Sequence, residues 1–384
     1  MWLNLLIIFI IITSGLHYMQ FEKVRYTSNS LGRPLGIITT PRKSYILFIT
    51  LLLILQSGLR NVGVGADTYA YYEAFERVKE LSWSEVFYTV STYYHLGEGK
   101  DPGYLVFQKL FQYISGDYQV YLVFIATLFF SALAYFIHRN TKVVSDALFA
   151  FVLYSTLFYS FFSITGIRQT ITTAAALWGY ELIKRKKLLP FLLLILVAST
   201  IHKSTLIIIP LYFIRNKKAV KYLLISFVIL LPLMFVFSGP ISLFFKSMDD
   251  IYNEYERIPG LQPYNFVFFQ LLIFLLGIIT YKESLNQKHY PYTMFWYVAL
   301  MLATFFTTQV FQVHGFMRVI YYFSIFNLLL IPHMVKLLAI RWKISNKELM
   351  FWCIILLVAL YMKGAWGSDY GFFWQQIELG ENYR

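Results

Sequence analysis

About a dozen apolar stretches constrain this chain more than any other feature of its sequence. A membrane-crossing helix needs about 20 mostly apolar residues, and fewer where the bilayer thins or a segment lies inside a bundle. Only helices and closed barrels satisfy their backbone in lipid, and the alternation of a barrel is missing. We therefore predict an all-α polytopic membrane protein with about 12 transmembrane helices, some short or re-entrant. The stretches lie near 2–19, 44–60, 118–138, 146–163, 168–183, 188–200, 203–214, 222–238, 263–281, 292–309, 316–338 and 349–366.

The composition argues against a water-soluble enzyme of this length. Hydrophobic residues make up 58% of the 384 residues and charged residues only 14%, whereas soluble domains average about 25% charged residues. We expect one transmembrane domain over residues 1–384. We expect its first apolar segment to be a transmembrane helix and no cleavable signal peptide, because the basic residues Lys23 and Arg25 follow the apolar run. The single cysteine, Cys353, excludes an intrachain disulfide.

The formal net charge of +13 is informative once it is divided among the loops. If 188–214 forms two short helices broken at His202-Lys203, 21 of the 33 Lys and Arg residues lie on one side. If it forms one helix, the numbers of Lys and Arg residues on the two sides of the membrane are nearly equal. The positive-inside rule favours the pair and places both termini outside. The charge therefore records orientation, and no nucleic-acid partner is predicted.

Two longer segments then lie on the extracytoplasmic side. Residues 61–117 are predicted to hold short amphipathic helices, and residues 239–262 form a second loop. Loops longer than about 15 residues in a compact domain are usually functional or disordered. We therefore expect the chemistry at the outer face. The second loop carries the acidic residues Asp249, Asp250, Glu254 and Glu256.

Two polar residues near the outer ends of predicted spans are costly there, and so are candidates for function. Arg168, followed by Gln169, opens a span. A cation at a helix N-terminus opposes the macrodipole, so something anionic should compensate it, and a phosphate suits a guanidinium beside free backbone N–H groups. Alternatively, Arg168 only contacts the phosphates of membrane lipids. His202 is a candidate general base or phosphate donor, or simply a residue that caps the turn.

Four further residues, His314, Arg318, Asp67 and Asp101, complete the candidates. His314 and Arg318 lie four residues apart and share a helical face. Asp67 follows Gly63-Val64-Gly65-Ala66 and could be a base, a sugar ligand or a partner for an arginine. Asp101-Pro102-Gly103 has the composition of a turn. No metal-binding motif is present, so no metal site is predicted.

Several short motifs, in this order, resemble the EpsG family of Wzy-type bacterial polysaccharide polymerases. The resemblance covers roughly residues 45–335 and departs at Ala66, where a Thr or a similar polar residue is common. The motifs are Gly65-Ala66-Asp67-Thr68-Tyr69 with Tyr72, Asp101-Pro102-Gly103-Tyr104, Gly166-Ile167-Arg168-Gln169, Ile201-His202-Lys203-Ser204, and Arg318 with Tyr321 and Tyr322.

The resemblance implies a GT-C-like membrane glycosyltransferase at the outer face of the bacterial plasma (inner) membrane. Undecaprenyl-diphosphate-linked oligosaccharides would be its donor and acceptor. A flippase and a chain-length regulator are candidate protein partners. Membrane lipids would surround the protein, and no cofactor is expected. The implied site residues are Asp67, His202 and Arg168 for catalysis, Arg168, Gln169, Arg318 and His314 for the diphosphate, and Tyr69, Tyr72 and Asp101 for sugar.

In the mechanism that we expect, an acceptor hydroxyl attacks the donor anomeric carbon and the lipid diphosphate leaves. Arg168 and Arg318 would neutralise the developing charge. Either Asp67 or His202 would accept the hydroxyl proton. We prefer His202 as the general base or as a ligand of the diphosphate, and Asp67 as the residue that positions the acceptor.

Other functions fit parts of the pattern. A lipid-linked oligosaccharide flippase or another transporter would also need arginines, but the polar residues gather at one face and no internal repeat is visible. Another membrane glycosyltransferase, a ligase or an acyltransferase would share the composition. So would a scaffold of a capsule-assembly complex that carries no activity.

Overall fold

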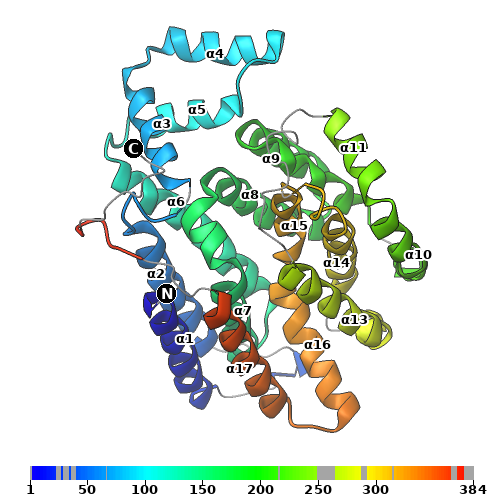
Figure 1. Ribbon diagram of the computed structural model, residues 1–384. Helices are drawn as coiled ribbons and strands as arrows, with labels where there is room; N and C mark the ends of the chain where they lie inside the picture. The colour runs from blue at the N-terminus through cyan, green and yellow to red at the C-terminus, as the bar shows by residue number, and fades with distance from the viewer. Residues whose placement is uncertain are drawn as a thin grey trace. The chain divides into compact units, whose positions relative to one another are not determined.

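The chain folds into helices in two compact units (Figure 1). Met1–Leu206 and Phe351–Arg384 form the first unit, and Ile207–Met350 form the second. In this computed structural model the described residues are 2–22, 27–28, 34–35, 40–65, 67–214, 217–248, 264–286, 292–313, 315–364 and 370–375.

The first unit contains most of the sequence motifs. Its helices pack pairwise: α2 lies against α6, α6 against α8, α8 against α9, and α1 against both α2 and α7. The labels refer to α1 (Trp2–Gln20), α2 (Thr40–Gly58), α3 (Thr68–Glu80), α4 (Trp83–Leu96), α5 (Pro102–Phe111), α6 (Tyr118–Asn140), α7 (Val144–Leu153), α8 (Ile167–Lys184) and α9 (Leu188–Ile201). Two π-helical turns, η1 (Tyr154–Phe158) and η2 (Ser160–Thr165), join α7 to α8.

The second unit is helical as well. Helix α13 packs on α14 and α16, and α14 also contacts α10 and α15. Its helices are α10 (Lys217–Val236), α11 (Ser238–Met248), α13 (Tyr264–Asn286), α14 (Thr293–Thr307), α15 (Phe316–Ser324) and α16 (Asn327–Trp342). The 3₁₀ helix η3 (Lys203–Phe213) and helix α17 (Asn346–Gly364) each belong partly to both units.

Strand structure is minor among the described residues. Strand β1 (Thr27–Ser28) pairs antiparallel with β2 (Pro34–Leu35), and Arg60 forms an isolated bridge with Phe372. The helical architecture agrees with the predicted fold class.

The predicted apolar stretches coincide with helices, although the number of crossings stays a prediction. By length and apolar character, three helices within the described residues could cross a membrane: α1, α6 and Tyr264–Ser284 of α13. Helices α15 and α16, bent by 55° relative to each other, would make a fourth if they form one span. The other predicted stretches fall on shorter helices or on α2, α8 and α17, whose ends carry charged residues. These apolar helices are those of a membrane-embedded protein.

The predicted break in 188–214 is confirmed. Helix α9 ends at Ile201, His202 is extended (φ −156°, ψ 107°), and the 3₁₀ helix η3 begins at Lys203. The Thr205 hydroxyl donates to the His202 carbonyl at 2.7 Å and holds the break. Whether α9 and η3 cross the membrane separately stays a prediction.

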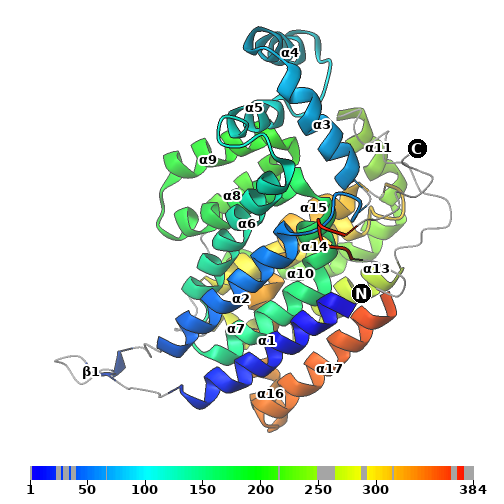
Figure 2. The same ribbon diagram turned by 90° about the vertical axis from the view of Figure 1, so that its left-hand side faces the viewer.

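The segment predicted as the first long loop holds α3, α4 and α5. Figures 1 and 2 show the three helices together at one end of the first unit. A capping box between Ser82 and Glu85 starts α4, and Gly97 ends it in the left-handed conformation. In the predicted second loop, residues 239–262, the first part is helical, because α11 runs from Ser238 to Met248. The acidic residues Asp249, Asp250, Glu254 and Glu256 lie outside the described residues. The side of the membrane on which either segment lies stays a prediction.

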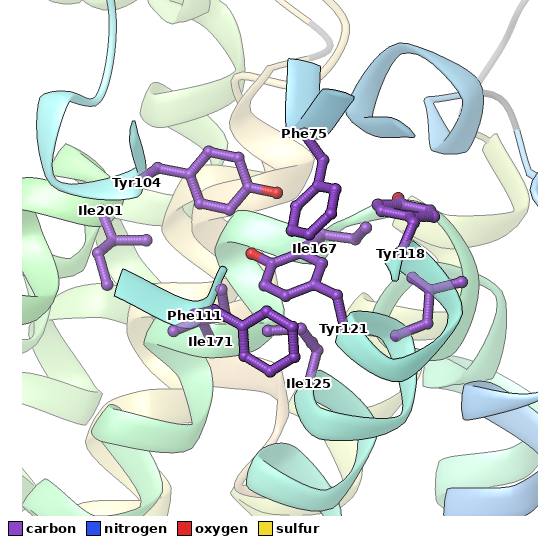
Figure 3. Close-up of a cluster of buried hydrophobic side chains, with 10 residues drawn as sticks. Phe75, Tyr104, Phe111, Tyr118, Tyr121, Ile125, Ile167, Ile171 and Ile201 are labelled. Atoms are coloured by element: carbon purple, nitrogen blue, oxygen red, sulfur yellow. The ribbon is translucent and has the colours of Figure 1, made fainter. Parts of the chain in front are cut away.

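An aromatic core fixes α3 and α5 against α6 (Figure 3). Phe75 of α3 stacks on Tyr121 of α6 with ring centroids 5.0 Å apart, and Phe111 of α5 contacts the same ring at 5.0 Å. Such pairs contribute about 0.5–1.5 kcal/mol each beyond area burial. Because α3 and α5 begin at the motif residues Thr68 and Pro102, this core positions both motifs.

A buried polar network anchors α8 at its other end. The side chain of Glu181 accepts hydrogen bonds from Asn140 Nδ2 at 3.0 Å and Lys184 Nζ at 2.8 Å. Lys184 Nζ also donates to Asn140 Oδ1 at 2.8 Å. The network joins the C-terminal ends of α6 and α8, so it fixes α8 at the end opposite to Arg168.

Candidate functional site

Arg168 follows an unusual turn. The π-helical stretch η2 ends at Thr165, and the N–H of the next residue, Gly166, donates to Phe161 O at 2.8 Å. Helix α8 starts at Ile167, and the Thr170 hydroxyl donates to Phe162 O at 2.9 Å, which ties its first turn to η2. A Cβ at Gly166 would lie 2.8 Å from the Phe161 ring, so a larger residue would have to displace that ring. π-helical turns of this kind are frequent at functional sites.

The Asp67 motif packs directly against this turn. Gly65 has φ +102°, and a Cβ there would lie 2.5 Å from Ile164 Cγ2. The Thr68 hydroxyl lies 2.7 Å from Val64 O and 3.2 Å from Ile164 O. These contacts place Asp67, which precedes α3, beside the peptides that lead into Arg168.

Asp101 is held where α5 meets α9. It precedes α5 in the left-handed conformation (φ 50°), with Pro102 at the first helical position. A Cβ at Gly103 would lie 2.7 Å from the backbone carbon of Thr200, so α5 approaches the end of α9 closely. This contact brings Asp101 to His202, two residues beyond Thr200.

Arg168, Asp101 and His202 meet in one cluster. The Arg168 Nη1 pairs with Asp101 Oδ2, and His202 Nδ1 lies 3.7 Å from the same oxygen. The exposed fractions of the side chains are 18% for Arg168, 5% for Asp101 and 14% for His202. Tyr71 supports the guanidinium: its hydroxyl accepts from Nε at 3.4 Å, and its ring lies 5.7 Å from Cζ. Asp101 is therefore the anion that the position of Arg168 requires.

The two neighbours determine the charge of Asp101. Burial alone would raise the pKa of its carboxyl, but the neighbouring His202 and the Arg168 charge outweigh burial and hold the pKa below its usual value. At neutral pH the carboxylate is ionised and the Arg168–Asp101 pair is locally neutral. A substrate anion that binds Arg168 therefore meets an already compensated guanidinium.

Residues 43–377 match the sequence model of the EpsG family. The chain belongs to the EpsG family. No curated protein and no solved structure matches it. The four motifs that the structure brings together lie inside the matched region.

The other predicted site residues of this EpsG-family chain lie elsewhere or further apart. Tyr69 and Tyr72 are half-buried on α3, with ring centroids 6.0 Å apart, and Tyr72 packs edge-on against Tyr118. Gln169 is almost fully buried beside Arg168. Arg318 starts α15 in the second unit, so its part in a diphosphate site stays a prediction. His314 lies outside the described residues.

Sequence reasoning assigned no site role to three residues of the first unit, Tyr71, Tyr104 and Arg60. Tyr71 contacts Arg168, and Tyr104 packs on Tyr71 with ring centroids 5.9 Å apart. Arg60, just beyond α2, is only 3% exposed. The sequence does mark Arg60 as unusual, because an arginine at the outer end of an apolar stretch opposes the positive-inside rule. Tyr71 lies four residues after Asp67, so in a helix the two side chains lie on the same face.

Proposed function

We propose that this EpsG-family protein polymerises oligosaccharide repeat units carried on undecaprenyl diphosphate, by glycosyl transfer at the outer face of the plasma membrane. Family membership supports a polymerase role in exopolysaccharide synthesis. The observation that carries the chemistry is the cluster of Arg168, Asp101 and His202, which gathers three separate motifs at the N-terminus of α8.

Departure of the lipid diphosphate is the first task of such a site. The developing charge falls on phosphate oxygens, which a guanidinium binds in its planar fork. Arg168 is held by Asp101 and Tyr71 before substrate arrives, so its orientation costs little at the moment of reaction. The first N–H groups of a helix have no partner within the helix, so those at the start of α8 add donors of the same sign.

Removal of the acceptor proton is the second task. Asp101 faces Nδ1 of His202, which favours the proton on Nδ1 and leaves Nε2 able to accept. We assign His202 as the general base in this arrangement. Asp67, at the start of α3, would then hold the acceptor sugar, with Tyr69 and Tyr72 offering aromatic faces on the same helix.

The test is direct. The purified protein in detergent receives a lipid-linked repeat unit, and the glycans are separated by size. A ladder of longer glycans supports the enzyme, whereas unchanged substrate together with vesicle translocation would instead show a flippase. If alanine at both Arg168 and His202 leaves polymer output in cells intact, the protein is a scaffold.

A matched control is available on the same helix. Arg185, at the other end of α8, donates to the Tyr135 hydroxyl at 2.9 Å and is exposed, much as Arg168 contacts Tyr71. Arg185→Lys should leave the ladder unchanged. Arg168→Lys keeps the charge but loses the fork, and should shorten or abolish the ladder.

A further inference from the structure

Side chains from three other helices hold the end of η2. The last carbonyls of a helix have no partner within that helix. In η2, three consecutive carbonyls instead accept from hydroxyls: Phe162 O from Thr170 of α8 at 2.9 Å, Ser163 O from Ser57 of α2 at 2.9 Å, and Ile164 O from Thr68 of α3 at 3.2 Å. The position of the turn into Arg168 therefore depends on α2, α3 and α8.

Ser57 is a donor that lies outside the sequence motifs. Helix α2 carries none of them, and 106 positions separate Ser57 from Ser163. Ser57 is buried, with 4% of its surface exposed. The Tyr154 hydroxyl of η1 lies 2.7 Å from the Ser163 hydroxyl, so Ser163 is held through both its backbone and its side chain. Without the Ser57 hydroxyl, a buried carbonyl of η2 would lose its side-chain partner.

The end of α2, where Ser57 lies, is capped by donors from outside the helix. Two come from the C-terminal segment, residues 370–375, which lies beside this end in both views (Figures 1 and 2). The bonds run from the Tyr370 hydroxyl to Gln56 O, from Arg60 Nη1 to Ser57 O at 2.5 Å, and from the Phe373 N–H to Leu59 O at 2.9 Å. The negative end of a helix favours such a cation and such donors. The C-terminal segment therefore helps to fix the residue that holds Ser163.

Tyr370 also contacts the site turn directly. Its side chain packs against a small buried cluster of Val64, Tyr159 and Ile164. Val64 precedes the first motif, and Ile164 belongs to η2. One side chain therefore links the C-terminal segment to both of the segments that meet before Arg168.

We propose that Ser57 and Tyr370 are positioning residues of Arg168: they fix η2, and through it the guanidinium, in the orientation that receives the lipid diphosphate. The part of the guanidinium in the reaction rests on the proposed function. Arg168 is the second residue of α8, so a shift of the turn before α8 moves it directly. A misplacement of about 1 Å costs on the order of a hundredfold in rate when a reacting group must be aligned.

Two conservative variants test this role. Ser57→Ala removes the hydroxyl that donates to Ser163 O. Tyr370→Phe removes the hydroxyl that donates to Gln56 O and keeps the ring that packs against η2. Each variant loses one hydrogen bond and leaves the Arg168 cluster itself unchanged.

Two matched controls lie on α2. Thr50→Val and Tyr45→Phe also remove buried hydroxyls that donate to helix carbonyls, but those carbonyls lie outside η2. Thr50 donates to Ile46 O at 2.6 Å, and Tyr45 donates to Ile11 O at 3.1 Å. Since all four variants lose one bond of the same kind, their melting temperatures should fall to a similar extent.

The first measurement is hydrogen–deuterium exchange of the full-length protein in phosphatidylcholine nanodiscs, followed in peptides that cover residues 160–170. Exchange there should be about fivefold faster in Ser57→Ala and in Tyr370→Phe. It should be unchanged in Thr50→Val and Tyr45→Phe. A tyrosine or serine that only stabilises the fold would not separate from these controls.

The second measurement is glycosyl transfer with a lipid-diphosphate-linked repeat unit. Ser57→Ala and Tyr370→Phe should lower kcat about tenfold and leave KM unchanged, because the interaction that they weaken is made in the transition state. The two controls should keep the wild-type kcat.

Wild-type exchange in both test variants would overturn the proposal. Faster exchange with an unchanged kcat would overturn it as well, because Arg168 would then not depend on η2. If Ser57→Ala does not fold, Tyr370→Phe decides alone. Absence of transfer by the wild type would instead contradict the proposed function, and exchange, which needs no substrate, would still decide whether the two residues hold the turn.

Discussion

Replacing Asp101 with Asn removes the charge that lies between Arg168 and His202 and keeps the size of the side chain. Removing one partner of a buried ion pair costs about 3–5 kcal/mol, because the other charge stays buried. Asp101 is 5% exposed but Arg168 is 18% exposed, which lets water compensate part of the loss. We therefore expect a cost near the lower limit, about 3 kcal/mol.

The assay is a double-mutant cycle of Asp101→Asn, Arg168→Gln and the double variant. Stability is measured by denaturant unfolding of the protein in detergent micelles. Arg168→Gln should also be costly, since it leaves the carboxylate unpaired. The double variant should cost less than the two single variants together, by about 1–3 kcal/mol.

Additive costs in this cycle would refute the reasoning, because they would mean that the two side chains do not interact. Tyr71→Phe is the matched control. It removes the 3.4 Å hydrogen bond from Arg168 Nε and keeps the aromatic ring. Its cost should be about 1 kcal/mol and no more.

Three further predictions concern the same unit. The pKa of Asp101 is lower in the folded protein than in the unfolded chain, so its carboxylate contributes stability above about pH 4 that is lost as the pH falls through the folded pKa. In thermal unfolding measured against pH, Asp101→Asn should reduce the loss of stability at acid pH. The same loss in the variant and the wild type would contradict the assignment. Gly65→Ala should cost more than about 1 kcal/mol, given φ +102° and the 2.5 Å approach to Ile164, and wild-type stability and glycan output would show that this turn is not rigid. Truncation after Gly364 removes residues 370–375, which pair with the chain beyond α2 through main-chain hydrogen bonds of 2.8 and 2.9 Å; the melting temperature should fall, and an unchanged value would mean that this pairing carries no stability.

The positions of the helices followed from the sequence because long apolar blocks leave the backbone few alternatives in lipid. The number of crossings did not follow. Arg42 and Lys43 lie in the first turns of α2, and Lys347 and Glu348 in those of α17, so the ends of these helices are charged. Length and hydropathy alone cannot place such ends relative to a bilayer.

The break at His202 was predictable, since a histidine and a lysine interrupt an apolar run. The role of Asp101 was not. Its neighbours Pro102 and Gly103 have the composition of a turn, and the turn is there. Its pairing with Arg168 depends on the close approach of α5 to α9 at Thr200, which no local pattern reveals.

The π-helical turns before Arg168 also had no sequence signal. The Thr68 hydroxyl lies 3.2 Å from Ile164 O of η2, a contact between residues 96 positions apart that no local pattern reveals. Arg60 was overlooked because a cation at the end of a span resembles an interface anchor. Only its burial distinguishes it.

One measurement tests the central claim most directly: single-turnover glycosyl transfer by the purified protein, comparing wild type, Arg168→Lys and Arg185→Lys on a lipid-diphosphate-linked repeat unit. We predict transfer by the wild type and by Arg185→Lys, and a rate lower by at least about tenfold for Arg168→Lys. Normal transfer by folded Arg168→Lys would contradict the bidentate diphosphate site, and no transfer by the wild type would contradict the polymerase itself.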